Sequence, residues 1–401
     1  MAAKSNEIRQ AKSLQGLFRA MLPNRLRHFL IGLPHSYVLK TKSLASIRNW
    51  TYKKVDSEVE IKRFHPSEVD PKMLPVYDQF CPRGQLQPET FSIVIPNGFT
   101  FSKRGYVFSE DGILLGDLTN QPDLSNFNGH PIFTKEILAC NRLHLKGRVA
   151  LLSTIGCDIY YHALIDMIPR IRLLEESGFS LNEFDSFIIP KNIPNAIVSI
   201  LDKLGINGSR LKKVSRNTLV QAEELVVPSL AHLRMRPRPQ SIRFLRESIL
   251  PRILGDSAKK TDSGNKRIYI KRAGRRSLLN ECEIQKILNK FSFKVISPES
   301  MSFEEQVSTF MNAEVILGLH GAGLANAAFT KGDAKILEIA PLDFPRFCYF
   351  DLALSAGHSL TRIPAKGIQP YGISKKRKTS RTSMLVNPDD LDRYLSQHIS
   401  L

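Results

Sequence analysis

Residues 313–339, AEVILGLHGAGLANAAFTKGDAKILEI, constrain the fold of this chain more than any other segment. The first seven residues are apolar and β-prone, and they end at the turn His320-Gly321-Ala322-Gly323. A helix of small residues is expected over 324–329 and a second buried strand over 335–339. This order predicts a strand–helix–strand unit whose helix crosses over in the right-handed sense onto a parallel sheet.

The glycine turn has the chemistry of a phosphate site. His320 lies at the carboxyl end of its strand, where open α/β sheets bind ligands. Gly321 and Gly323 let a ligand approach the backbone, and the unpaired N–H groups of the next helix suit a diphosphate. The alternative is an ordinary tight turn with a satisfied histidine, because short glycine motifs occur often by chance.

The charge of the chain favours polyanionic partners. There are 57 Lys and Arg against 38 Asp and Glu, a formal net charge of +19, which attracts nucleic acid, anionic lipid or phosphate-bearing substrates. No nucleic-acid-binding motif accompanies the charge, so that function has charge alone behind it. The five cysteines are scattered without a CxxC pair, which indicates neither disulfides nor zinc and favours a reducing compartment.

The pattern along the chain predicts two α/β domains. Strands and helices alternate over 91–235 and start afresh over 236–372, which indicates two Rossmann-like, doubly wound domains facing a cleft. A basic extension and connecting region (1–90) precedes them. A basic loop with a C-terminal helix (373–401) follows and is expected to return to the N-terminal domain. The pattern of residues 5–31 predicts a basic amphipathic helix that either lies on an anionic membrane or docks on its own domain.

The first candidate constellation is the segment YYHALIDMIPR, residues 160–170. On a helix, His162 and Asp166 share one face, and Arg170 lies one turn further. A histidine–aspartate pair near a strand end suits a general base and the group that orients it. An intrahelical ion pair that only satisfies itself is the alternative.

The second constellation is the basic turn KRAGRR, residues 271–276, directly after the strand RIYI. Its cations suit the oxygens of a diphosphate, although a solvated basic turn is the commoner outcome. Asn280 is expected to cap the next helix. Glu338 lies in the apolar strand KILEI, where it either accepts hydrogen bonds from a ribose diol or forms a core ion pair with one of these arginines.

Together these segments resemble glycosyltransferase family 61. The resemblance rests on GLHGAGLANAAF, KILEI, SFEEQVSTFMNAEVILG, RIYIKRAGRRSLLNE and YYHALIDMIPR, which occur in the family's order. It implies a GT-B fold and inverting, metal-independent transfer of a sugar from a nucleotide donor, with no cofactor. The donor side then comprises Arg272, Arg276, Asn280, His320, Gly321, Ala322, Gly323, Asn326 and Glu338. The side facing the acceptor comprises Tyr161, His162, Asp166 and Arg170.

The bacterial version linked to capsular or other surface polysaccharides looks closest, and UDP is the nucleotide that the resemblance favours. The expected partners are a nucleotide-sugar and a glycan or lipid-linked glycan. The expected location is the cytoplasm, with attachment to the inner face of the membrane left open. The only DxD motif, residues 390–392, lies far from any strand end and is not expected to bind metal.

In this mechanism Asp166 or His162 is the base, with Asp166 slightly favoured, and cations stabilise the departing diphosphate. A dinucleotide-dependent oxidoreductase lacks its GxGxxG signature here. A basic nucleic-acid- or membrane-binding protein would explain the charge without using His320 or Glu338.

Overall fold

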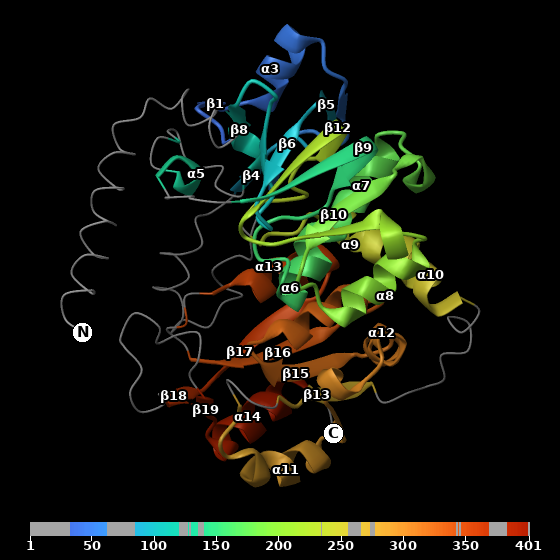
Figure 1. Ribbon diagram of the computed structural model, residues 1–401. Helices are drawn as coiled ribbons and strands as arrows, with labels where there is room; N and C mark the ends of the chain where they lie inside the picture. Colours follow the sequence, from blue (N-terminus) through green and yellow to red (C-terminus); the bar gives the residue numbers. More distant parts are fainter. Residues whose placement is uncertain are drawn as a thin grey trace, which may run out of the picture.

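The computed structural model describes residues 33–61, 85–119, 127, 130–134, 140–233, 235–255, 266–272, 277–341, 344, 346–368 and 383–399. Two β-sheets are stacked with a layer of helices between them. In Figure 1 the N-terminal sheet lies above, the C-terminal sheet lies below, and helices α6, α8 and α13 lie between them. The expected amphipathic helix over 5–31, the basic cluster near 375–381 and Arg276 lie outside the described residues.

The N-terminal sheet has ten strands in the order β1-β8-β7-β6-β12-β9-β10-β11, with β5 pairing β12 and β2 pairing β5. Its strands are β1 Ser36–Val38, β2 Tyr52–Lys54, β5 Phe91–Pro96, β6 Phe99–Phe101, β7 Tyr106–Phe108, β8 Ile113–Leu115, β9 Asn141–Leu151, β10 Ser186–Pro190, β11 Leu211–Val214 and β12 Thr218–Pro228. The region expected only to connect, 1–90, thus contributes β1 and β2.

The expectation of a doubly wound N-terminal domain is correct only for part of this sheet. Strands β9 to β12 run parallel to one another in the order β12-β9-β10-β11. Strands β5, β6 and β7 pair in the antiparallel sense. The reason lies in the connections: four residues join β6 to β7 and four join β7 to β8, too few for the crossover that parallel strands require.

The C-terminal sheet has five parallel strands in the order β14-β13-β15-β16-β17. They are β13 Arg267–Ile270, β14 Lys294–Ile296, β15 Val315–Leu319, β16 Lys335–Ala340 and β17 Ser359–Pro364. Counted along the chain this is the order 2-1-3-4-5, a doubly wound arrangement whose ligand crevice lies at the carboxyl ends of the first and third strands. The expected strand–helix–strand unit is confirmed as β15, the 3-10 helix η10 (Ala322–Phe329) and β16.

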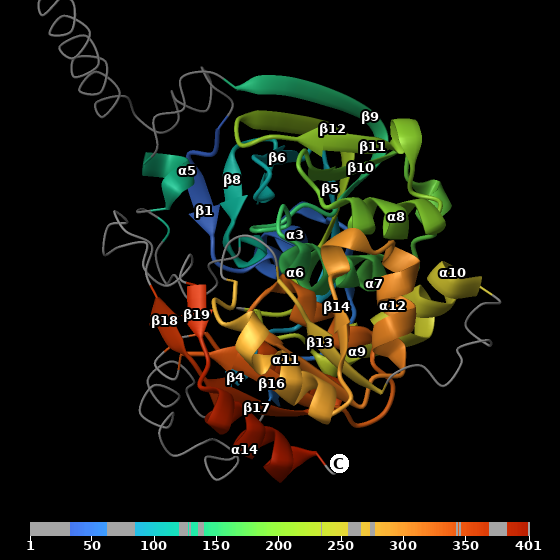
Figure 2. The same ribbon diagram turned by 90° about the horizontal axis from the view of Figure 1, so that it is seen from below.

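The last helix, α14 (Pro388–His398), packs on α11 (Glu281–Lys290) and on β17. Figure 2 shows α14 and α11 near each other beside β17. The expectation that this helix returns to the N-terminal domain is therefore wrong. Leu391 and Leu395 lie fully buried in the same apolar cluster as Leu288 of α11, so the amphipathic face of α14 is satisfied within the C-terminal half.

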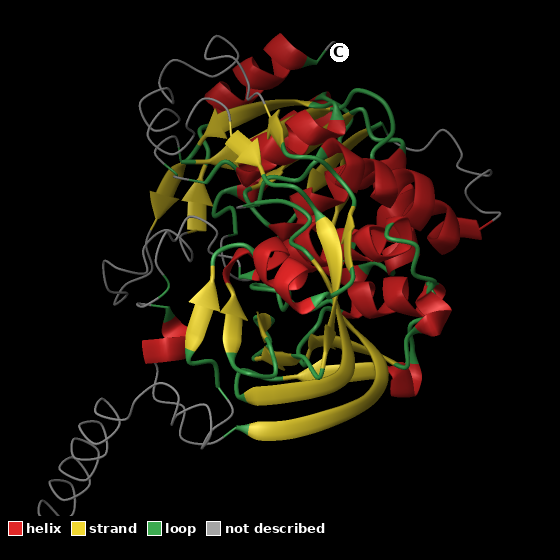
Figure 3. Ribbon diagram, turned by 90° about the horizontal axis from the view of Figure 1, so that it is seen from above, coloured by secondary structure: helices red, strands yellow, loops and turns green. Residues whose placement is uncertain are grey.

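The helices between the sheets belong to one continuous apolar core. It extends from Phe187 and Val226 of the upper sheet to Ile268 and Ile316 of the lower one. Figure 3 shows the helices gathered between the strands of the two halves. The two halves are thus joined by packing, and the GT-B arrangement stays a prediction. The helices of this layer are α6 Tyr160–His162, η4 Ala163–Met167, α7 Pro169–Glu176, α8 Asn195–Lys203, α9 Pro239–Phe244, η7 Leu245–Ile249, α10 Leu250–Leu254, α12 Phe303–Met311, η10 and α13 Cys348–Ala356.

Smaller elements lie at the edges. Among the described residues, none of the helices combines the length and apolar character that crossing a membrane requires. The remaining elements are α3 Thr41–Arg48, β3 Val59–Ile61, β4 Gln85–Gln87, η3 Gly116–Leu118, α5 Pro131–Thr134, η5 Leu181–Glu183, η6 Gly208–Arg210, η9 Pro298–Ser300, β18 Lys366–Ile368 and β19 Ser383–Leu385.

Candidate active site

The expected histidine–aspartate pair forms on the helix that follows β9. Nδ1 of His162 lies 2.7 Å from Oδ2 of Asp166. The helix widens here to a π-turn, η4, in which Ile168 N–H bonds to the carbonyl of Ala163. Such turns are frequent at functional sites. Gly156 makes room for the ring, because a Cβ at this position would lie 2.7 Å from Cδ2 of His162.

A second histidine, which the sequence reasoning missed, reaches the same carboxylate from outside this helix. Nε2 of His232 lies 2.8 Å from Oδ1 of Asp166, and the His232 side chain is only 2% exposed. His232 follows β12, which runs parallel to β9 in the sheet. Because the carboxyl ends of parallel neighbours meet at one edge, a histidine four residues past the strand could have been considered.

The three side chains control one another's protonation. Burial alone would raise the pKa of the Asp166 carboxyl, but the charge of His232 and hydrogen bonds from both histidines lower it to about 2. Burial opposes protonation of His162, yet its hydrogen bond to Asp166 raises its pKa above the ordinary value. Asp166 is thus held ionised between the two histidines, whereas the His162 side chain remains 22% exposed.

The histidine of the glycine turn is also oriented by a carboxylate. Nδ1 of His320 bonds to Oε1 of Glu338, and Oε2 of Glu338 accepts from Nε of Arg362 at 2.8 Å. Glu338 and Arg362 are paired residues on neighbouring strands, and neither side chain is exposed to solvent. Burial would raise the pKa of Glu338, but the charges of Arg362 and His320 lower it to about 2.

Glu338 therefore forms a core ion pair and does not present its carboxylate to a ribose diol. Its partner is Arg362 of β17, not an arginine of the basic turn after β13 as one alternative expected. The strand register explains the difference, because it sets Arg362 directly opposite Glu338. Glu338 affects the glycine turn only indirectly, because its hydrogen bond to Nδ1 orients the ring of His320.

Arg272 and Gly321 make close contact at the carboxyl ends of β13 and β15. Nη1 of Arg272 donates to the carbonyl of His320 at 3.2 Å. A Cβ on Gly321 would lie 2.0 Å from the same nitrogen, so glycine is needed for this approach. Ala322 and Gly323, which begin η10, are half-buried. This is the crevice that the strand order favours for a ligand.

Two residues that were expected to contact the donor form hydrogen bonds within the protein instead. Asn326 is fully buried, accepts from the hydroxyl of Tyr160 and donates to Oε1 of Gln306 at 3.1 Å. Asn280 stands at the start of α11, but its side chain does not cap that helix. It bonds instead to the backbone of Val386, donating at 2.8 Å and accepting at 3.3 Å. The geometry favours structural roles for both.

The two other residues expected to face the acceptor are buried as well. The Arg170 guanidinium donates to the carbonyls of Leu152, Ser153 and Pro228, at 3.1, 2.8 and 2.5 Å. It thus ties the ends of β9 and β12 together, and burial lowers its pKa to about 10. The Tyr161 hydroxyl donates to the carbonyl of Met235 at 3.2 Å. The structure therefore does not place either side chain on an acceptor surface.

A row of aromatic rings joins the two histidines. Tyr161 packs edge-to-face against His162, with ring centroids 5.4 Å apart, and against Tyr349 at 5.5 Å. Tyr349 in turn packs edge-to-face against His320 at 4.9 Å. Its hydroxyl donates to the carbonyl of Gly321 at 2.6 Å. The helix that carries His162 and the glycine turn are thereby brought together.

A further cation was missed by the sequence reasoning. Arg346 is exposed on the loop between β16 and α13. Its charge acts to lower the pKa of His162, against the larger effect of Asp166. Its carbonyl accepts from Nη2 of Arg362 at 2.5 Å. Arg272 thus bonds to the backbone of one histidine, and the charge of Arg346 acts on the other.

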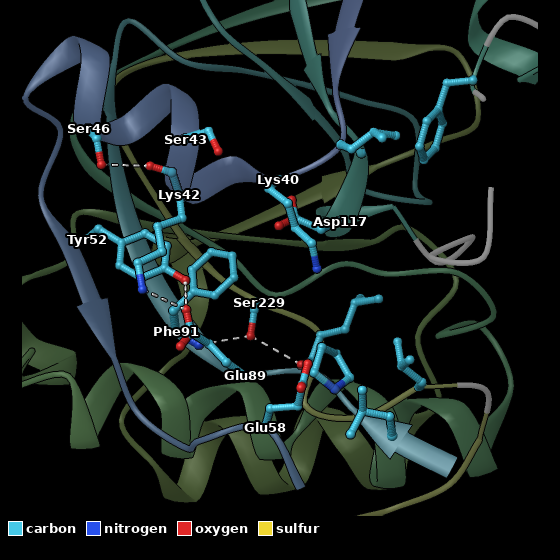
Figure 4. Close-up of a pocket in the computed structure, with 17 residues that line it drawn as sticks. Lys40, Lys42, Ser43, Ser46, Tyr52, Glu58, Glu89, Phe91, Asp117 and Ser229 are labelled. Carbon is cyan, nitrogen blue, oxygen red and sulfur yellow. Dashed lines mark hydrogen bonds and ion pairs between the residues drawn. The ribbon is translucent and has the colours of Figure 1, made fainter. Parts of the chain in front are cut away.

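A separate cavity of about 870 Å³ lies in the N-terminal half, between α3 and the segment after β12. Figure 4 shows Lys42 and Tyr52 both directed to the carboxylate of Glu89. Tyr52 donates to Glu89 at 2.8 Å, and Asp117 accepts from the backbone N–H of Thr41 at 3.0 Å. Leu230 and Leu233 line this cavity, whereas His232 between them contacts Asp166.

Comparison with known proteins agrees with the family that the sequence resembles. Residues 160–337 match the model of the family Glycosyltransferase 61. The segment includes His162, Asp166, His232, Arg272 and the glycine turn.

Two curated relatives are similar over shorter stretches. The EGF domain-specific O-linked N-acetylglucosamine transferase of Drosophila melanogaster is 34% identical over 85 residues, 20% of this chain and 16% of the relative. The beta-1,2-xylosyltransferase XAX1 of Oryza sativa subsp. japonica is 31% identical over 105 residues, 25% of this chain and 18% of the relative. The aligned stretches thus cover less than a fifth of each relative. Family and relatives together support a glycosyltransferase, as the sequence predicted.

Proposed function

We propose that this protein transfers a sugar, with inversion, from a nucleotide-sugar to a hydroxyl group of a glycan acceptor. The observation that carries the proposal is a pair of oriented histidines, one from each half, that two packed tyrosine rings link. His162 is held by Asp166 and His320 by Glu338, and Tyr161 and Tyr349 connect them. One side offers a base and the other a crevice for a diphosphate.

His162 is the better base of the two residues that the sequence left open. Its Nδ1 faces Asp166, so a neutral ring with its proton on Nδ1 leaves the lone pair of Nε2 for the acceptor. Asp166 already has a histidine at each oxygen. In the reaction the acceptor oxygen attacks the anomeric carbon, its proton passes to Nε2 of His162, and the bond from the sugar to the diphosphate breaks.

The departing diphosphate needs compensation for its negative charge. We assign this role to Arg272 and to the backbone N–H groups at the start of η10, with Arg346 as a further cation. No metal is required in this scheme, because the chain's own cations supply the charge.

The donor and the acceptor are proposed from similarity. The names of the relatives specify N-acetylglucosamine and xylose transfer, so UDP-N-acetylglucosamine and UDP-xylose are the first donors to test. Both relatives are eukaryotic, and a role in bacterial capsular or surface polysaccharide synthesis is a proposal that rests on the sequence resemblance. Location in the cytoplasm, at the inner face of the membrane, belongs to the same proposal.

The test is a screen of nucleotide-sugars for donor hydrolysis and binding, followed by transfer assays with the best donor. We expect His162→Gln to abolish transfer while donor binding persists. His144→Gln is the matched control, because His144 is exposed on the first half of β9. Stabilisation by oligonucleotides and by no nucleotide-sugar would refute the proposal and favour a nucleic-acid-binding protein.

A further inference from the structure

We propose that His232 is a positioning residue of this site, which holds the second oxygen of Asp166 and thereby sets the basicity of His162. The inference rests on the proposed function for its catalytic consequence. Its structural part, the coupling of three side chains, stands on geometry alone and can be measured without any sugar.

The surroundings of His232 determine which of its nitrogens carries a proton. Nε2 lies 2.8 Å from Oδ1 of Asp166 and 3.3 Å from the carbonyl of Ile165. Both neighbours are acceptors, so Nε2 must be a donor. Nδ1 is buried and has no hydrogen-bond partner among the described residues. The Nε2–H of His232 bonds to the carbonyl of Ile165, and Oδ1 of Asp166 lies 2.8 Å from the same nitrogen.

The segment that carries His232 is fixed on both sides. Ser229 accepts the backbone N–H of Phe91 at 3.1 Å, which ties the segment to β5. The backbone N–H of Leu233 donates to Oε1 of Gln87 at 2.9 Å. The position of His232 is thus set by the N-terminal half before any substrate binds, as a positioning group requires.

When two histidines share one carboxylate, the interaction of each histidine with that carboxylate is weaker than it would be alone. A hydrogen bond from His232 withdraws charge from Asp166, so Asp166 stabilises the protonated form of His162 less than it would alone. The other charges that affect His162 are Asp158, which acts to raise its pKa, and Arg346, which acts to lower it. Asp158 is itself paired with Lys103 at 2.5 Å.

The other ionisable groups near His162 are uncharged, or their effect on the pKa of His162 is the same in all variants. Burial raises the pKa of the Cys157 thiol far above its ordinary value, so it carries no charge. Burial raises the pKa of Tyr161 in the same way. Neither group changes when His232 is replaced. A change in the titration of His162 then reports on the bond between His232 and Asp166.

The experiment compares His232→Leu with His232→Gln by NMR titration of the His162 ring in protein labelled at histidine. Leucine removes the donor, whereas the Nε2 of glutamine can donate to Asp166 from nearly the same position. We expect the leucine variant to raise the pKa of His162 by about one unit and the glutamine variant to leave it near the wild-type value. Equal pKa values in all three proteins would overturn the proposal.

The kinetic readout follows the same direction. In His232→Leu the rise of kcat/KM with pH should move to higher pH by about one unit, which lowers the rate on the acidic limb about tenfold. In His232→Gln the pH profile should match that of the wild type. A residue with only a structural role would lower activity or stability at every pH without moving this limb. A shift in the NMR titration with no transfer in wild-type protein would refute the function and leave the coupling intact.

The wild-type protein provides a test that needs no variant, in case His232→Leu does not fold. Long-range proton–nitrogen correlation spectra report which nitrogen of His232 carries hydrogen. We expect a protonated Nε2 with a slowly exchanging proton. A neutral ring protonated only at Nδ1 would contradict the proposal, because it would leave no donor facing Asp166.

Discussion

Replacement of Gly321 by alanine is the sharpest test of how the glycine turn works. The added Cβ would lie 2.0 Å from Nη1 of Arg272. To restore an ordinary contact of 3.4 Å, the guanidinium must move by about 1.4 Å. The φ angle of Gly321 is −175°, which alanine adopts readily. The cost therefore falls on the position of Arg272 and not on the backbone.

We expect the effect to appear in catalysis and not in stability. The end of a flexible side chain can shift at small cost, so the Tm of Gly321→Ala should stay close to that of the wild type. Misplacement of a charge-stabilising group by about 1 Å can cost about 100-fold in rate, so kcat/KM for the donor should fall by that order. Gly323→Ala is the matched control, since its Cβ would meet two apolar atoms, Cγ2 of Ile270 at 3.2 Å and Cγ of Pro298 at 3.8 Å.

A double-mutant cycle then isolates the cause. If displacement of Arg272 is the whole effect, Gly321→Ala should cost nothing further in an Arg272→Ala background. The assay is donor hydrolysis and transfer with the best nucleotide-sugar, together with calorimetric donor binding. Normal kinetics in Gly321→Ala, or additive losses in the double variant, would refute the reasoning.

Three other expectations follow from the same site. Glu338→Gln should lower the free energy of unfolding, measured by urea titration, by about 3 kcal/mol or more, because it leaves Arg362 buried without its charge partner. An unchanged urea midpoint would contradict the core ion pair. Asp166 and Glu338 have folded-state pKa values of about 2, below the ordinary 3.8 and 4.5, so the stability they contribute is present above pH 4.5 and is lost as the pH falls towards 2. Unfolding midpoints at a series of acidic pH values, compared with those of Glu338→Gln, should show this loss. Transfer should persist in excess EDTA, and loss of activity that Mg²⁺ or Mn²⁺ restores would refute metal independence.

The C-terminal half could be predicted well because its signals are local. The run ending at His320 and the strand containing Glu338 are joined by a short helix, so their parallel pairing follows from the order of elements. The partner of Glu338 could not be found in this way. Arg362 lies 24 positions further along the chain, and only the strand register reveals that they face each other. The basic turn is further from Glu338 in sequence than Arg362 is, but it was chosen because it follows a strand expected to lie beside that of the glycine turn.

In the N-terminal half, contacts between residues far apart in the sequence could not be predicted. His162 and Asp166 could be paired because they are four positions apart on one helix. His232 reaches Asp166 across 66 positions, through the pairing of β9 with β12. Arg170 was expected to face the acceptor, yet three backbone carbonyls surround it. Burial of a charged group depends on distant strand ends that a local pattern does not show.

The continuous apolar core between the two sheets has a consequence for how the protein can be divided. Residues from both halves contribute to that core, so neither half alone can bury its apolar surface away from water. We expect the described parts of both halves to unfold in one cooperative transition, and a separately expressed C-terminal half to aggregate. Substrates would then reach the site by movement of loops around a rigid centre, and not by a hinge that separates two independent bodies.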